Sequence, residues 1–239
     1  MDNSKRSFGR RYYTKKDVLD EIEMRDPVRM AEMSKHFYQI SGIYSRLCRY
    51  MAYLYKYDWK ITPYINAPEL IVDDEDMEQN VKINKNITKK FNKVLFCLDT
   101  FNVKKNLGEM ALAVVVRGVY YGYIVRTDDK SRVSIQELPT KYCRTRYNVN
   151  NRPVIEFNMH YFDDQFPNIE LRKRILKMFP EDFQKGYRLF KAGKLKSSIP
   201  QESDWYTLDL DCAFKLNLND DDCPPFCSVL PAILDLELA

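Results

Sequence analysis

The stretch at residues 30–57, "MAEMSKHFYQISGIYSRLCRYMAYLYKY", decides how the fold of this chain is read. Apolar side chains recur in it every seven residues, and a second row follows the first three residues later. The rows consist of Met30, Phe37, Tyr44 and Met51, and of Met33, Ile40, Leu47 and Leu54. Because such positions share one face of an α-helix, the pattern predicts a single long amphipathic helix over residues 28–56.

The start of this helix has its own signal. Asp26 and Pro27 precede the apolar rows; aspartate caps a first turn, and proline is tolerated in that turn. The mixture of Met and Tyr with few β-branched residues favours packing within the chain over an independent coiled coil. We expect five residues to form the core stripe of the helix: Met33, Phe37, Ile40, Leu47 and Leu54.

Further helices follow on the C-terminal side. Residues 59–72 contain two prolines and predict an extended crossing segment. Residues 77–101 hold a second apolar helical face, and residues 103–117 predict a third helix that is apolar almost all round from Met110 to Val116 and therefore buried. Gly118 is expected to end it.

After Gly118 the residue pattern becomes typical of β-strands. Alternating β-branched and aromatic residues predict strands at 119–126, 132–138, 142–149 and 153–162, forming one antiparallel meander of three or four strands. Helices are expected again at 168–179 and 180–193, and a strand-like segment with a polar loop at 204–226. The predicted class is α+β, a long amphipathic helix and helical bundle packed with a small antiparallel sheet.

These elements suggest a serial organisation along the chain. We expect a basic arm at 1–16, a helical region at 17–117, a β meander at 118–165, helices and a strand at 166–227, and the start of a further helix at 228–239. In that last segment Pro231 stands where a first-turn proline belongs, and the aliphatic spacing is close to helical. We therefore expect residues 228–239 to be the first turns of a helix that is truncated in this sequence.

Composition limits the class of protein. The chain has 239 residues, of which 45% are hydrophobic and 30% charged, so it is long enough for a substantial core. No apolar stretch suggests a membrane span or a secretory signal, which predicts a cytoplasmic chain without membrane contact. The six cysteines are mostly far apart and fit reduced thiols better than a disulfide framework.

The N-terminus is locally basic although the net charge is only +4. Aromatic residues are interleaved with its cations, so this arm could contact phosphate, contact a neighbouring subunit, or be a solvated leader. The candidate contact residues are Arg6, Arg10, Arg11, Tyr12, Tyr13, Lys15 and Lys16.

Catalytic signatures are scarce. His36 lies in the long helix, and His160, near Asp163 and Asp164, is read as part of a turn after a strand. Cys212, Cys223 and Cys227 lack zinc-site spacing. With only 7 glycines the chain has no phosphate-binding loop or dinucleotide fingerprint. We expect no enzyme activity, no cofactor and no metal site.

Several motifs in this order resemble the portal proteins of tailed bacteriophages, especially those of phages that infect Gram-positive hosts. The resemblance runs from about Tyr13 to the C-terminus. It rests on the long helix of residues 30–57, then "GVYYGYIVR", "LPTKYC", "VIEFNMHYF", "DWYTLDLDCAFKLNL" and "PPFCSVLPAI".

The resemblance implies a structural subunit of a homo-oligomeric ring, commonly a dodecamer, at one vertex of the virion. Double-stranded DNA would pass through its channel without being read by sequence, driven by a separate terminase, and the ring would also meet the major capsid protein and a tail adaptor. The chain would correspond to the wing and the start of the stem, would assemble in the host cytoplasm, and would hydrolyse nothing.

Two other hypotheses stay open at this point. The first is a non-enzymatic nucleic-acid-binding accessory protein that uses the basic arm. The second is a metal-dependent hydrolase built around His160 and the adjacent aspartates. The mass of the purified assembly separates the ring from both.

Overall fold

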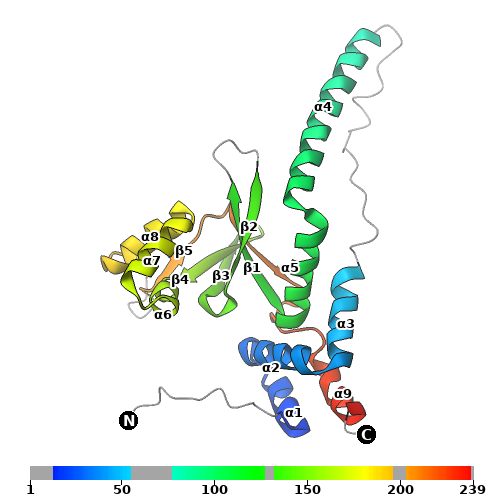
Figure 1. Cartoon of the computed structure of the whole chain (residues 1–239), viewed down its shortest axis with the longest axis vertical. Helices are drawn as coiled ribbons and strands as arrows, with labels where there is room; N and C mark the ends of the chain where they lie inside the picture. Colours follow the sequence, from blue (N-terminus) through cyan, green and yellow to red (C-terminus); the bar gives the residue numbers. More distant parts are fainter. Residues whose placement is uncertain (1–12, 55–76, 127–131, 196–202, 238–239) are drawn as a thin grey trace. The chain divides into compact units, whose positions relative to one another are not determined.

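The computed structural model describes residues 13–54, 77–126, 132–195 and 203–237 (Figure 1). It has an α+β fold, which confirms the class expected from the sequence. The chain divides into two compact units. The helical unit takes Met1–Ala52, Ala111–Val119 and Asn217–Ala239, and the mixed unit takes Tyr53–Met110 and Tyr120–Leu216.

The helical unit begins with α1 (Lys15–Met24), a helix that the sequence reading assigned in part to the basic arm. Thr14 and Asp17 form a reciprocal capping box at its start, which satisfies backbone donors that a helix end leaves unpaired. α1 ends at Arg25, whose φ of 49° is left-handed. α2 (Pro27–Ile40) starts as predicted, because the Asp26 side chain accepts hydrogen bonds from the backbone N–H groups of Val28 and Arg29.

The prediction of one continuous helix over 28–56 is wrong, because α2 ends at Ile40 and α3 (Gly42–Tyr53) begins after a break. Ser41 has extended dihedrals, φ −91° and ψ 118°. Its hydroxyl oxygen accepts a hydrogen bond from the Tyr44 N–H at 3.1 Å, as a residue that caps a helix start does. A serine that bonds nearby backbone competes with the helix, and the glycine beside it has low helix propensity.

The break changes which residues are buried. Met33 and Phe37 of the predicted core stripe are buried, as expected. Ile40 is 63% exposed and Leu54 46% exposed, and Leu47 is half-buried, so this part of the predicted stripe does not lie in the core. α3 instead buries Tyr44, Cys48 and Ala52. Interrupting the helix at Ser41 ends the continuous seven-residue register that the prediction assumed.

Four further segments complete the helical unit. They are the C-terminal part of α5 (Val103–Arg117), a turn that includes Cys223, the short 3₁₀ helix at Cys227–Val229, and α9 (Leu230–Glu237). α5 is buried from Ala113 to Val116, and Gly118 follows it with a φ of +84°. The core of the unit contains Val18, Met30, Met33, Phe37, Tyr44, Cys48, Ala52, Val115, Val116, Cys223, Cys227, Leu230 and Ile233.

In its described residues the mixed unit contains α4 (Met77–Phe101), the N-terminal part of α5, six strands and three further α-helices. The strands are β1 (Val119–Arg126), β2 (Val133–Leu138), β3 (Cys143–Val149), β4 (Arg152–Asn158), β5 (Trp205–Thr207) and β6 (Ala213–Asn217). The helices are α6 (His160–Gln165), α7 (Ile169–Met178) and α8 (Glu181–Lys191). The bounds of α4, α7 and α8 agree with the predicted ranges.

The predicted single meander is wrong, because the strands form two three-stranded sheets. One has the order β2-β1-β6 and the other β3-β4-β5, and the pairings β1–β2, β3–β4 and β4–β5 are antiparallel. Pro139 and a 3₁₀ turn at Thr140–Tyr142 separate β2 from β3, so these neighbours in sequence do not pair. Each hairpin is instead completed by a strand from the segment near residue 210, which the sequence reading left unpaired.

The end of β4 also differs from the prediction. The strand stops at Asn158, and residues 160–165 are helical, where a strand to 162 was expected. The Asn158 side chain accepts a hydrogen bond from the His160 N–H at 3.0 Å, and this local bond favours a turn over further strand. Asn150 and Asn151 both have positive φ in the β3–β4 hairpin, as a two-residue type I′ turn requires.

Aromatic rings dominate one part of the mixed unit. Phe183 of α8 lies 5.0 Å from Tyr123 and 5.2 Å from Phe157 between ring centroids, in edge-to-face geometry. Phe162 of α6 contacts Phe179 at 5.0 Å and Tyr187 at 5.3 Å in the same geometry. These rings attach α6 and α8 to the strands. In the described part of the chain, no helix is both long and apolar enough to cross a membrane.

Candidate assembly surface

α3 carries two apolar faces. Its buried face consists of Tyr44, Cys48 and Ala52, spaced four residues apart. A second row, Ile43, Leu47, Tyr50 and Leu54, is spaced by four, three and four residues and follows a different line along the helix. We call this second row the outer face of α3. Tyr50 is 70% exposed, Ile43 and Leu54 are each 46% exposed, and Leu47 is half-buried.

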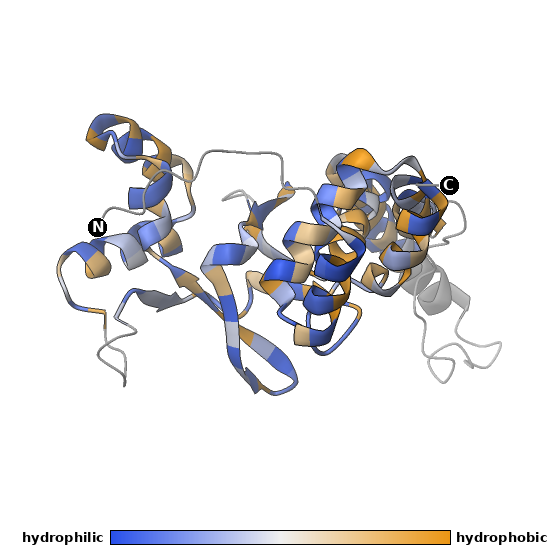
Figure 2. Cartoon of the chain, turned by 90° about the horizontal axis from the view of Figure 1, so that it is seen from below, coloured by the Kyte–Doolittle hydropathy of each residue, from blue (hydrophilic) through white to orange (hydrophobic). Residues whose placement is uncertain are grey.

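The residues around the outer face are also suited to a protein contact. Met51 and Ile40 are exposed beside it, and Arg46 is exposed at its edge. Tyr, Met and Arg are enriched in protein interfaces, where the aromatic rings bring large apolar area and arginine brings hydrogen bonds. A helix that is apolar on most of its circumference is normally buried. The described residues leave Ile43, Tyr50 and Leu54 of the outer face exposed, which favours coverage by a partner. Figure 2 shows the distribution of hydropathy over the ribbon.

The buried side of α3 is held by a polar network. The hydroxyl groups of Tyr44 and Ser34 lie 2.8 Å apart, and the Ser41 hydroxyl donates to Glu237 of α9 at 2.5 Å. Burial raises the pKa of the Tyr44 hydroxyl far above its usual value. The phenol therefore stays neutral, and the bond with Ser34 persists over the physiological pH range. This network fixes the rotation of α3, which sets the direction of the outer face.

Buried thiols line the same core. Burial raises the pKa of Cys48 to about 11 and that of Cys227 to about 12. Both thiols therefore remain protonated at neutral pH, which makes them poor nucleophiles and poor metal ligands. All six cysteines are free in the structure. Within the described ranges no group of three His, Cys, Asp or Glu side chains is placed to hold a metal ion.

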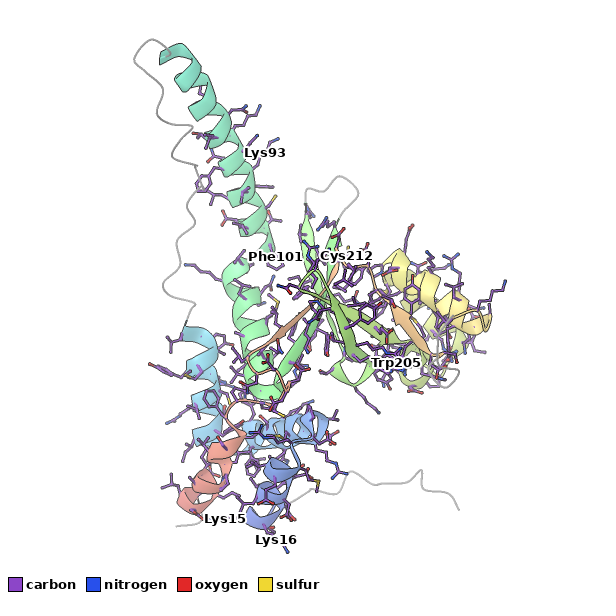
Figure 3. The ribbon with its side chains drawn as sticks, turned by 180° about the vertical axis from the view of Figure 1, so that it is seen from behind. Lys15, Lys16, Lys93, Phe101, Trp205 and Cys212 are labelled. Carbon is purple, nitrogen blue, oxygen red and sulfur yellow. The ribbon has the colours of Figure 1, made fainter. Side chains whose placement is uncertain are left out.

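The basic arm is described only from Tyr13 onward; Arg6, Arg10, Arg11 and Tyr12 lie outside the described residues. The Tyr13 ring lies 5.3 Å from the His36 ring and 5.9 Å from the Phe37 ring. Lys15 forms an ion pair with Asp235 of α9 at 2.6 Å. The described end of the arm therefore packs on its own helical unit. Lys16 is exposed on α1, and Figure 3 labels both lysines.

His160, Asp163 and Asp164 do not converge on one point. His160 Nε2 lies 3.3 Å from Asp204, and its ring lies 4.8 Å from the Phe190 ring. Asp163 receives hydrogen bonds from Arg172, Tyr187 and Lys191, at 2.5, 2.8 and 2.7 Å. Asp164 accepts from the Tyr142 hydroxyl at 2.9 Å. The carboxylate oxygens of Asp163 and Asp164 thus connect α6 to α7, to α8 and to the turn at Tyr142. These contacts stabilise the packing of the helices.

A shallow cavity of about 330 Å³ lies in the mixed unit between the ends of β1, β4 and β6. Arg152 and Asp211 on its wall pair with each other at 3.1 Å. Lys215 also lines the cavity, with its Nζ 6.0 Å from the centroid of the Tyr121 ring, and Ile124, Pro153 and Phe214 contribute apolar surface.

Comparison of the chain with models of protein families, with curated proteins and with solved structures found no match. The functional argument therefore rests on the surfaces of the chain itself and on the motifs of its sequence.

The outer face of α3 was misread at the level of sequence, because Leu47, Leu54 and Ile40 were assigned to the core. The available signal was the dipeptide Ser41-Gly42 inside an otherwise helical pattern. Serine followed by glycine favours a cap, and a cap restarts the helix with a new rotation.

Proposed function

We propose that this chain is a structural subunit of a bacteriophage portal, a ring through which double-stranded DNA is packaged into the capsid and later ejected. The observation that best supports this proposal is the outer face of α3, an apolar helical surface that the described residues leave largely exposed. A subunit of a closed ring needs a surface that meets a different surface on the next copy. The identity of the ring comes from the sequence motifs.

The chemistry of the outer face fits a permanent contact between subunits. Exposed Tyr50 and Met51 would supply buried area, and Arg46 would supply polar contacts at the rim. α9, the helix that the resemblance assigns to the start of the stem, is tied to α1 by Lys15–Asp235 and to Ser41 by Glu237. In a ring, a displacement of α9 would therefore reach the first residues of α3 through these bonds.

The test is the mass of the purified protein. A single chain has a mass of 28.5 kDa, and we expect mass photometry and electron microscopy to find ring-shaped particles of many subunits. Replacing Ile43 and Tyr50 together by Asp should yield monomers, because two carboxylates would have to lose their hydration in the contact. Since both positions are exposed, the thermal unfolding temperature should change little.

A matched control is available on α7. Ile169 and Met178 are also exposed apolar residues, 62% and 80% accessible, so their double replacement by Asp adds the same charge to a different helix. We expect this control to assemble like the wild type. A wild-type protein that stays monomeric at micromolar concentration would defeat the ring and favour the nucleic-acid-binding alternative. Particles that survive the α3 replacements would place the subunit contact elsewhere.

A further inference from the structure

α4 presents a row of lysines on its outward side. Lys85, Lys89 and Lys93 are spaced four residues apart and are all exposed, and Lys90 is exposed beside them. Four residues of α-helix rise about 6 Å, so the three ammonium groups follow one line along the helix. Figure 3 labels Lys93 on this helix. We call these four residues the lysine face of α4.

The opposite side of α4 explains why the lysines point outward. Ile87, Phe91, Leu95 and Leu98 repeat with helical spacing and are all half-buried. The helix therefore has one half-buried apolar side and one exposed cationic side. This orientation is built into the sequence of α4 and does not depend on the conformation of any single lysine.

The lysine face has no internal counter-charge. No acidic residue occurs between positions 81 and 98, and in the described part of the chain these four lysines form no ion pair. By contrast, Lys105 pairs with Glu109 on α5, and Lys173 pairs with Glu170 on α7. Like charges four residues apart destabilise a helix. A bound polyanion would remove this repulsion.

Two uncharged residues among the lysines are hydrogen-bond donors. Asn86 and Asn92 are exposed among the lysines. Lysine and asparagine side chains are common donors to phosphate oxygens in protein–DNA complexes, and such contacts do not depend on base sequence. Val94 and Phe96, 49% and 65% exposed, follow the last lysine at the C-terminal end of the row. From Lys85 to Lys93 the exposed residues are lysine, asparagine and threonine, without the apolar centre surrounded by a polar rim that a docked protein partner uses. The chemistry of the lysine face thus fits an extended phosphodiester better than a folded acidic protein.

We propose that the lysine face of α4 binds the phosphate backbone of double-stranded DNA. The choice of duplex over single strand rests on the proposed function, while the phosphate chemistry rests on α4 alone. The expected binding is independent of sequence and strongly dependent on salt.

The test compares full-length variants by fluorescence anisotropy with a labelled duplex of random sequence between 50 and 200 mM salt. Replacing all four lysines by Gln should lower the slope of log affinity against log salt by about 3 to 4, since each lost phosphate contact lowers it by ~0.9. Glutamine is a good helix former, so α4 should persist, which circular dichroism checks. Replacing the same lysines by Arg should keep the slope.

The control removes the same charge elsewhere, from four exposed lysines on other elements: Lys35, Lys177, Lys185 and Lys194. We expect this control to retain most of the slope. An equal loss in both quadruple variants, or no loss in the α4 variant, would overturn the proposal. A loss seen only with a single strand of the same sequence would overturn the duplex assignment.

Particle mass is measured on the same samples, so the two proposals fail separately. If the wild type is monomeric and its salt slope depends on the lysine face, DNA binding by this face is supported and the ring proposal is overturned. A ring whose DNA affinity is unchanged when the α4 lysines are replaced supports the portal proposal and overturns DNA binding by the lysine face.

Discussion

α3 and α8 are helices of similar length, but their apolar residues differ in how far they are buried. α8 buries Phe183, Gly186 and Tyr187, and none of its large apolar side chains is exposed. Its exposed positions are charged, among them Glu181, Lys185 and Arg188. α3 also buries three residues, yet it leaves Ile43, Tyr50 and Met51 in solvent.

The difference shows what apolar spacing does and does not determine. In α8 one apolar face is matched by one surface of the same unit, so the helix is complete within the chain. In α3 the apolar residues exceed what the helical unit covers. Spacing identifies the apolar positions of a helix, but the rest of the protein decides whether the chain or a partner covers them.

The largest effect that tests this comparison is expected from Phe183→Ala. Phe183 is fully buried among Tyr123, Phe157 and Phe179, and removing a buried phenyl ring costs about 3–5 kcal/mol. Tyr50→Ala on α3 should change the free energy of unfolding by less than about 0.5 kcal/mol, because the ring is exposed. Chemical denaturation of the dissociated protein measures both. Similar losses in the two variants would mean that the outer face is covered within one chain.

A smaller effect is expected from Gly186→Ala. A Cβ atom there would lie 2.5 Å from Met159 Cε and 2.7 Å from the Tyr206 ring. Overpacking of this kind costs about 1–3 kcal/mol, even though alanine is the better helix former. Thermal unfolding should therefore show a lower midpoint. An unchanged or higher midpoint would show that α8 is packed less closely than these distances indicate.

Acid should weaken the attachment of α8 but leave the outer face of α3 unchanged. Burial acts to raise the pKa of Asp163, but hydrogen bonds from Lys191 and Tyr187 and the charges of Lys191 and Arg172 outweigh it and lower the pKa. A depressed carboxyl pKa adds stability above the unfolded value of 3.8, and this stability is lost as pH falls through the folded value. The outer face of α3 has no carboxylate to titrate.

The measurement is the unfolding midpoint between pH 6 and pH 2.5 for wild type and Asp163→Asn. We expect the wild type to lose about 2–4 °C more than the variant below pH 4, equivalent to about 1 kcal/mol. Parallel curves for the two proteins would show that Asp163 contributes no acid-sensitive stability.

Much of the fold could be predicted because its signals are local. The ends of α4, α7 and α8 follow from helical spacing and flanking caps, and the β3–β4 hairpin follows from two asparagines that tolerate positive φ. The division into two sheets could not be predicted in this way. It depends on β5 and β6 pairing with strands some 50 to 90 residues earlier in the chain, and such pairings leave no local pattern.

The candidate surfaces were harder to predict than the elements that carry them. Leu47 and Leu54 have the same residue type and spacing as core residues, and only the covering segments of the helical unit distinguish them. The lysines of α4 were visible in the sequence, but their common exposed side becomes significant only because no acidic residue occurs between positions 81 and 98 and the described residues give these lysines no ion pair.

The smallest effect is expected at the junction that sets the direction of α3. Gly42 is the first residue of α3, and a Cβ there would have nothing within 4 Å. Gly42→Ala should be neutral or stabilise the protein by up to about 1 kcal/mol, through better helix propensity and a less flexible unfolded chain. Particle mass should stay unchanged, because the hydroxyl of Ser41 still caps the Tyr44 N–H. If glycine rather than serine causes the break, the same substitution would instead join α2 to α3, rotate the outer face, and abolish assembly while the helical content rises.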